Sequence, residues 1–225
     1  MVGPFTLGTL TICEGKDEVA IVERMIAEAL VPAMHVSCIG EPGAGPGIDA
    51  LTSHLEGLAV VTGFVTNIKS IGIVADNDLV NPTALARIID SVTAANANPD
   101  VGGRLSVPTS GFTRSSTGSI AVTPILSPGM NQTGCMETTL LSVLGRLYTP
   151  KMPCVDALIQ CAKTSAPPTF WGGSKEEKAR VRAAISILHT QNPNIPLSRL
   201  WKDNPALIPV SDSAFSYLHN ALCSL

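Results

Sequence analysis

The stretch Ser70-Ile-Gly-Ile-Val-Ala-Asp-Asn-Asp78 decides the fold class of this chain. A run of almost only apolar residues precedes the two carboxylates, and a strand covered on both faces of a parallel sheet has this unbroken apolar character. We therefore predict a buried strand over Ser70–Ala75. Because side chains alternate along an extended chain, Asp76 and Asp78 should point to one side and Asn77 to the other.

The residues before this stretch alternate between strand and helix patterns. Phe5–Cys13 alternates and is rich in Thr, Leu and Ile, which predicts a strand that ends at Glu14-Gly15. Apolar residues spaced by three and four predict a helix over Asp17–Leu30. A short strand at His35–Ile39 and a helix at Ile48–Leu58 should follow.

The same alternation continues after the stretch. We expect a helix that is capped by Asn81, with Pro82 at its first position. Two strands, Arg104–Pro108 and Ser119–Leu126, are expected at the edge of the sheet, and a helix at Cys135–Leu144. Since strands and helices alternate, we predict an α/β fold with a mostly parallel sheet flanked by helices.

After Pro150 the pattern is helical, and the charge changes sign. Residues 1–145 carry 6 basic and 13 acidic side chains, whereas residues 146–225 carry 9 basic and 5 acidic ones. We therefore divide the chain into an α/β domain, 1–145, and a helical C-terminal extension, 146–225, packed on it. Ser174-Lys-Glu-Glu177 predicts a capping box at the start of a helix. The expected helices are Val155–Lys163, Ser174–His189 and Ala214–Leu222.

Composition excludes several classes of protein. The 225 residues are 45% hydrophobic and 15% charged, as in folded globular domains, but only 4% aromatic, which disfavours base-stacking platforms for single strands. The most apolar stretch, Gly57–Thr66, is short of the roughly 20 residues that cross a bilayer, and we find no leader peptide. We therefore expect a cytoplasmic protein without a membrane partner. The six cysteines form no Cys-x-x-Cys pair and are expected to be reduced and mostly buried.

Carboxylates follow two of the predicted strands: Glu14 follows the first, and Asp76 and Asp78 follow the third. Ligands bind at this edge in open α/β sheets. Two neighbouring carboxylates repel each other unless a cation lies between them, and Mg²⁺ or Mn²⁺ prefers oxygen ligands. Such ions support phosphoryl transfer. An Asp-x-Asp segment after a strand is, however, also typical of a simple turn and helix cap.

Two motifs together resemble a known family. Thr11-Ile-Cys-Glu-Gly-Lys-Asp17 and Ile71-Gly-Ile-Val-Ala-Asp-Asn-Asp78 resemble the Toprim domain over about residues 5–145. The nearest resemblance is to a small Toprim-like group related to the overcoming-lysogenization-defect nucleases. In that group a Gly-x-x-Glu helix follows the core and a Lys-rich helical tail closes the chain; Gly134–Glu137, Lys163 and Lys175–Arg182 occupy those places here.

The resemblance implies a site and an activity. Glu14 would be a metal ligand or general base, Asp76 and Asp78 would hold Mg²⁺ or Mn²⁺, and Glu137 would be a further ligand. The implied activity is metal-dependent hydrolysis of phosphodiester bonds in DNA or RNA, in defence against phage. Because the chain has no ATPase domain, any ATPase would be a separate partner.

Several alternatives stay open at this point. Lys16, Lys163 and Lys178 are candidate phosphate-binding residues, although exposed lysines are usually only solvated. A phosphohydrolase or nucleotidyl transferase acting on a small nucleotide or structured RNA is a second hypothesis. A catalytically silent, metal-binding regulatory subunit is a third. One or two metal ions, and a monomer or a homo-oligomer, are equally compatible with the sequence.

Overall fold

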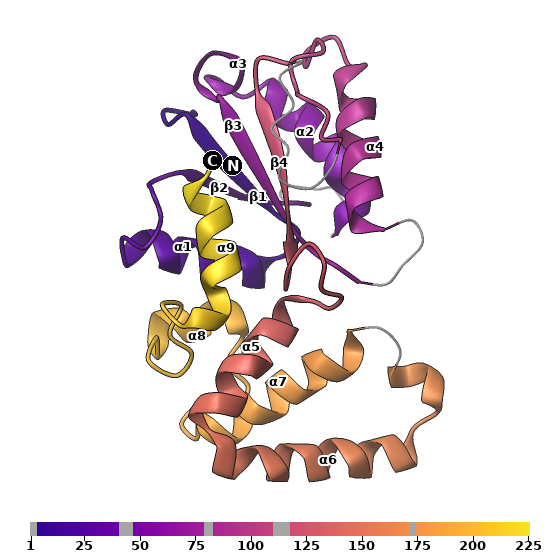
Figure 1. The fold of residues 1–225 in the computed structure, drawn as a ribbon, viewed down its shortest axis with the longest axis vertical. Coiled ribbons are helices and arrows are strands. Elements are labelled where there is room, and N and C mark those ends of the chain that lie inside the picture. The colour runs from indigo at the N-terminus through magenta and orange to yellow at the C-terminus, as the bar shows by residue number, and fades with distance from the viewer. Residues whose placement is uncertain (1–3, 41–46, 79–82, 110–117, 172–173) are drawn as a thin grey trace.

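A four-stranded, all-parallel sheet with the order β2-β1-β3-β4 forms the centre of the molecule (Figure 1). The computed structural model describes residues 4–40, 47–78, 83–109, 118–171 and 174–225. The prediction of an α/β fold with a parallel sheet is confirmed. The strands are β1 (Thr9–Cys13), β2 (His35–Cys38), β3 (Ser70–Asp76) and β4 (Ala121–Ser127).

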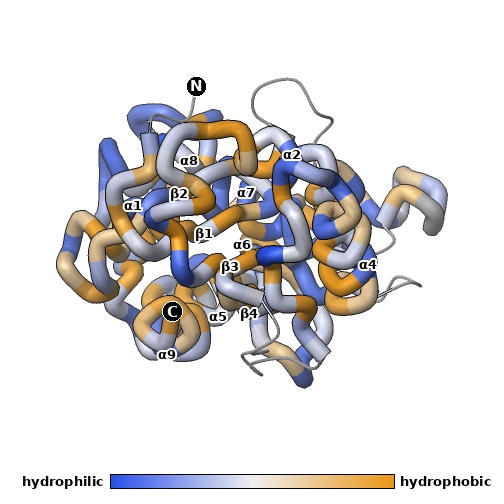
Figure 2. The backbone as a smooth tube through the Cα atoms, turned by 90° about the horizontal axis from the view of Figure 1, so that it is seen from above, coloured by the Kyte–Doolittle hydropathy of each residue, from blue (hydrophilic) through white to orange (hydrophobic). Residues whose placement is uncertain are grey.

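Helices cover both faces of the sheet (Figure 2). On one side, Ile73 and Ala75 of β3 join an apolar cluster with residues of α2 and α4. On the other side, Val74 joins a cluster with residues of α1, α5 and α9. This alternation explains the apolar run, because both faces of β3 are buried. The helices are α1 (Lys16–Ala27), α2 (Leu51–Ala59), α3 (Phe64–Asn67), α4 (Ala84–Asn96), α5 (Met136–Leu147), α6 (Met152–Ser165), α7 (Lys175–Leu188), α8 (Leu197–Asp203) and α9 (Ser216–Cys223).

The C-terminal helices share the core of the sheet. Trp201 and Phe215 belong to the same apolar cluster as Cys13 and Val74, so that this cluster crosses the predicted division at residue 145. The carboxyl ends of β1, β3 and β4 point towards α5, α6 and α7 (Figure 1). The described helices include none that is long and apolar enough to span a membrane.

The predicted strand at Arg104–Pro108 is wrong. In the part of the chain that the structure describes, this segment makes only an isolated bridge between Leu105 and Ile120. The side chain of Asn96 bonds both the N–H and the carbonyl of Leu105, at 3.0 and 2.7 Å. Since those backbone groups already have a side-chain partner, they are not used to extend a sheet ladder.

Two predicted helix caps differ from the structure. Helix α4 begins at Ala84, and the side chain of Thr83 caps it by accepting the N–H of Ala86. The expected cap at Asn81 and Pro82 is therefore wrong for the described helix, and those two residues lie outside the described ranges. Ser174 stands at the start of α7 but makes no capping hydrogen bond.

Further differences concern short elements and the cysteines. Helices α3 and α8 are not expected from the sequence. All six cysteines are free thiols, as expected, but the expectation that most are buried is wrong: Cys154, Cys161 and Cys223 are exposed, and only Cys13 and Cys135 are fully buried.

Candidate metal centre

Asp76 lies at the last position of β3 and connects three segments of the chain. Its backbone N–H donates to Glu14 Oε2 at 3.1 Å, and its Oδ1 accepts the N–H of Met136, the first residue of α5, at 2.8 Å. Its Oδ2 lies 3.5 Å from Lys178 Nζ on α7. Asp76 therefore fixes the spacing between the end of β1 and the amino terminus of α5.

Glu14 is held directly after β1. Besides the bond from Asp76, its Oε1 accepts the N–H of Ile48 at 3.4 Å. The next residue, Gly15, leaves room for Glu18, because a Cβ at Gly15 would lie 2.8 Å from Glu18 Oε2. The absence of a side chain at Gly15 therefore lets the carboxylate of Glu18 lie over this residue, next to Glu14 in the chain.

Asn77 organises the loop that precedes α5. Its side-chain amide donates to the carbonyls of Gln132, Gly129 and Met130 at 2.8, 3.1 and 3.4 Å. Its backbone bonds Ser127 and Gly134. The neighbouring Asp78 contacts Ser174, and Asp76 contacts Lys178, at the start of α7.

Replacing Asn77 with alanine should loosen this loop. The change removes the three amide hydrogen bonds, so we expect the free energy of unfolding to fall by about 2 kcal/mol and divalent-cation affinity to fall with it. Asn96→Ala is the matched control, since it also removes side-chain bonds to a loop, but at the opposite end of β4 from Asp76. Urea unfolding and calorimetric cation titration measure both quantities. Equal cation affinity in the two variants would contradict the role given to Asn77.

An open cleft of about 330 Å³ lies at the carboxyl edge of β1 and β3. Five carboxylates and two lysines converge on it, from the end of β1, the first turn of α1, the end of β3, and helices α5 and α7. Such convergence of like charges is unfavourable without cations nearby. The lining residues are Glu14, Gly15, Lys16, Asp17, Glu18, Gly47, Asp76, Glu137 and Lys178.

Burial and mutual repulsion change the protonation of these acids. Burial, together with the charge of Asp76, raises the pKa of Glu18 to about 8. Burial also raises the pKa of Asp76 to about 7, with added repulsion from Glu14 and Glu137. Burial acts to lower the pKa of Lys178, but the carboxylates of Glu137 and Asp76 outweigh it, and the pKa rises. The cleft therefore favours bound positive charge.

Three of these side chains form a group that could hold a metal ion. Ligand atoms of Asp76, Cys135 and Glu137 all lie within 4.8 Å of one another. Metal–ligand distances of about 2.0–2.3 Å place two ligands of one ion at most about 4.6 Å apart. The three side chains could therefore share one divalent cation after small rotations.

The C-terminal helices close one side of the cleft. Asp17 at the start of α1 accepts the N–H of Ser198 at 2.9 Å and lies 3.6 Å from Arg182. Ser174 donates its hydroxyl to Asp78 Oδ2 at 3.3 Å. This bond is why Ser174 does not cap α7, since its hydroxyl is turned towards the end of β3.

The predicted site residues divide into two sets. Glu14, Asp76, Glu137, Lys16 and Lys178 line the cleft. The carboxylate of Asp78 accepts the hydroxyl of Ser174. Asp78 is not part of the group that could hold a metal ion. Lys163, on α6, pairs with Glu176 at 2.7 Å and is not among the lining residues.

Asp17, Glu18 and Cys135 also belong to the site, and sequence reasoning did not assign them to it. Glu18 shares a helix face with the buried Ile21, Val22 and Met25, so an acid on an apolar face was the available signal. Cys135 stands at the cap position of α5, two residues before Glu137. Without a second cysteine or histidine in sequence proximity, nothing in the sequence singles it out as a ligand.

No family model, no curated protein and no solved structure matches the chain. The resemblance to the Toprim domain therefore stays a prediction.

Proposed function

We propose that this chain is a divalent-metal-dependent hydrolase of nucleic-acid phosphodiester bonds. The observation that carries the proposal is the convergence of Glu14, Asp76 and Glu137 with Lys16 and Lys178 in one open cleft. Carboxylates that hold a cation and amines that bind phosphate oxygens are the two kinds of group that phosphoryl transfer requires.

Roles can be assigned to the residues of the cleft. Asp76 and Glu137 would hold Mg²⁺ or Mn²⁺, which when bound supplies charge neutralisation at the phosphate and lowers the pKa of water. Glu14, fixed by two backbone N–H groups, would complete the ligand shell or accept the proton of the attacking water. Lys178 would move from Asp76 Oδ2 to a phosphate oxygen. The oxygen of the water would bond to phosphorus as its proton leaves, and the bond to the sugar oxygen would break while that oxygen takes a proton from solvent in the open cleft.

The experiment is a substrate screen with purified protein. Supercoiled DNA, linear DNA and RNA are incubated with Mg²⁺, Mn²⁺ or EDTA, using the native chain, Asp76→Asn, Glu137→Gln and the control Asp90→Asn, whose carboxylate is exposed on α4. We expect cleavage of one polymer that needs the cation, survives in Asp90→Asn and is lost in the other two variants. Cleavage in EDTA, cleavage by both site variants, or intact polymers throughout would overturn the proposal.

The two predicted phosphate-binding lysines should behave differently. Lys178→Met removes an amine that lines the cleft, and we expect hydrolysis to slow by at least about tenfold. Lys163→Met removes an amine that pairs with Glu176 outside the cleft lining, so its rate should stay within about twofold. Initial rates at saturating cation compare the two variants. Equal losses in both would contradict this assignment.

The size of the cleft favours a second candidate function. A volume of about 330 Å³ falls within the range of small-molecule sites, which is roughly 300–1,000 Å³. A mononucleotide phosphohydrolase or nucleotidyl transferase would use the same cation and lysines. Phosphate release from nucleotides in the same assay, with all polymers left intact, would favour this candidate over the first.

A further inference from the structure

We propose that Cys135 is a metal ligand and that the cleft takes a thiophilic divalent cation of the Zn²⁺ class between Asp76, Cys135 and Glu137. The inference deepens the proposed function, since it concerns the same cation site, but it does not depend on hydrolysis. A thiolate is a soft ligand, whereas Mg²⁺ takes oxygen ligands almost exclusively. The site therefore accommodates two chemical classes of cation with different ligand sets.

The position of Cys135 supports this role. Its side chain is fully buried and belongs to the group whose ligand atoms lie within 4.8 Å of one another. Its side chain forms the capping box of α5 with Thr138, 3.8 Å from Thr138 Oγ1, and the carboxylate of Glu137 acts on the thiol. The thiol thus caps α5 and at the same time lies next to the carboxylates of Asp76 and Glu137.

Glu137 provides the second observation. Its side chain is 8% exposed although it carries a carboxylate, and it lines the cleft. Buried carboxylates are normally paired with a cation or coordinate a metal. Two carboxylates and one thiolate give a three-ligand protein set with a further position for water, as catalytic zinc sites have.

Charge also balances in the bound state. Binding replaces the thiol proton, which leaves to solvent through the open cleft, and a metal–sulfur bond takes the place of the S–H bond. Asp76, Glu137 and the thiolate then carry three negative charges against the two positive charges of the cation. Lys178, 3.5 Å from Asp76 Oδ2, offsets the remainder.

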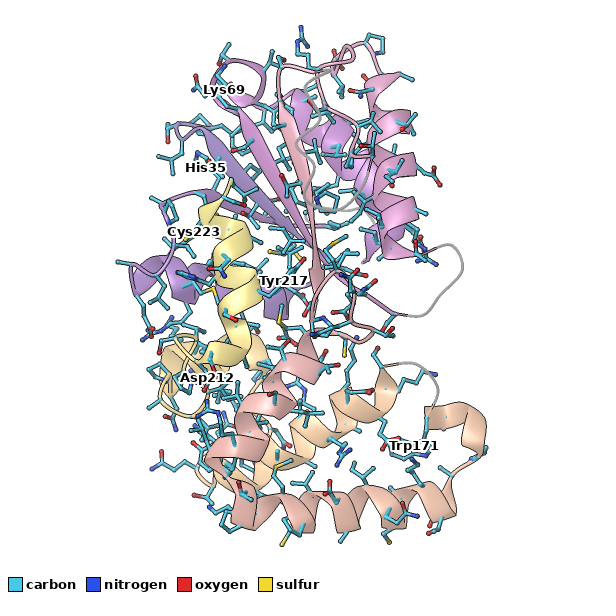
Figure 3. The ribbon with its side chains drawn as sticks, in the orientation of Figure 1. His35, Lys69, Trp171, Asp212, Tyr217 and Cys223 are labelled. Atoms are coloured by element: carbon cyan, nitrogen blue, oxygen red, sulfur yellow. The ribbon has the colours of Figure 1, made fainter. Side chains whose placement is uncertain are left out.

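The other cysteines serve as internal controls. Cys38 lies at the end of β2 and is partly buried, and Cys223 lies on α9 (Figure 3). Neither belongs to a metal-holding group in the part of the chain that the structure describes. Because serine is a good helix cap, Cys135→Ser should leave α5 intact. Circular dichroism and the thermal midpoint check that each variant is folded.

Co²⁺ is the probe, because a cobalt–thiolate bond absorbs in the near ultraviolet and a cobalt–oxygen bond does not. We expect the thiolate band when Co²⁺ binds the native chain and Cys38→Ser, and its absence in Cys135→Ser. Zn²⁺ should remove the band stoichiometrically, whereas excess Mg²⁺ should not. In calorimetry, Cys135→Ser should weaken Zn²⁺ binding by about tenfold or more and change Mn²⁺ binding by less than about threefold.

The outcomes separate this inference from the proposed function. Absence of the band in the native chain, whether or not Co²⁺ binds, overturns the inference, as does its persistence in Cys135→Ser. Metal-dependent cleavage of a polymer without the band supports the proposed function and rejects the inference about Cys135. A band that depends on Cys135, with no substrate cleaved, supports the inference and counts against the proposed function.

Discussion

Asp76→Asn is expected to abolish tight divalent-cation binding and to reduce metal-dependent hydrolysis by at least about a thousandfold. The substitution keeps the shape of the side chain, and the amide oxygen can still accept the N–H of Met136, which stands 2.8 Å from Oδ1. The substitution removes the negative charge that acts on Lys178 together with the charge of Glu137. Calorimetric Mn²⁺ titration and initial rates measure the two effects.

The stability of this variant distinguishes a catalytic carboxylate from a structural one. Because burial raises the pKa of Asp76 to about 7, its charged form is unfavourable in the metal-free fold. Asp76→Asn should therefore unfold no earlier than the native chain at neutral pH without cations. A native chain without hydrolysis, together with a variant that melts earlier, would instead indicate a regulatory subunit with a structural cation. Asp90→Asn, on the exposed face of α4, should change neither quantity.

The metal-free protein is expected to lose stability as the pH rises from about 4 to about 8. Glu18 and Asp76 have folded pKa values of about 8 and about 7, above the ordinary value near 4 of an unfolded carboxyl. Between those values the folded state binds more protons than the unfolded state, so the free energy of unfolding falls as the pH rises. At about 1.4 kcal/mol for each unit by which a pKa is raised, the two groups together contribute a loss of several kcal/mol.

Glu18→Gln tests this assignment. The amide cannot ionise, so the variant should match the native chain at low pH and exceed its stability by several kcal/mol at high pH. Glu23→Gln, exposed on the same helix, is the control and should follow the native curve. Urea unfolding in EDTA across the pH range gives the measurement. Saturating Mg²⁺ should flatten the curve, and an unchanged slope in Glu18→Gln would contradict the assignment.

The fold was predictable where one physical cause dominates. The apolar run of β3 identifies a strand buried on both faces, and the spacing of Ile21, Val22 and Met25 identifies α1. Prediction failed where a single side chain competes for backbone groups. The side chain of Asn96 bonds both backbone groups of Leu105, and the hydroxyl of Ser174 donates to Asp78 instead of capping α7. Hydrogen bonds of this kind between separate segments leave no periodic pattern in the sequence.

The structure brings together the predicted site residues that directly follow strands. Glu14 and Asp76 meet because the carboxyl ends of neighbouring parallel strands share one edge. Asp78 is also an aspartate, but it lies two residues beyond the end of β3 and contacts Ser174. Cys135 could not be recognised, because its place in the group depends on Asp76, which is distant in sequence. Glu18 offered one local signal, its position among the buried apolar residues of α1.

The connections of Asp76 also bear on how the chain folds. Its bonds to Glu14 and Met136 span 62 and 60 residues of sequence, and every strand pair is parallel and needs a crossover. Contacts of such high sequence separation form slowly, because the entropy of loop closure opposes them. The ligand set therefore assembles only when the sheet and α5 have docked. Cation capture during refolding is thus a late kinetic event, and its rate reports completion of the native topology.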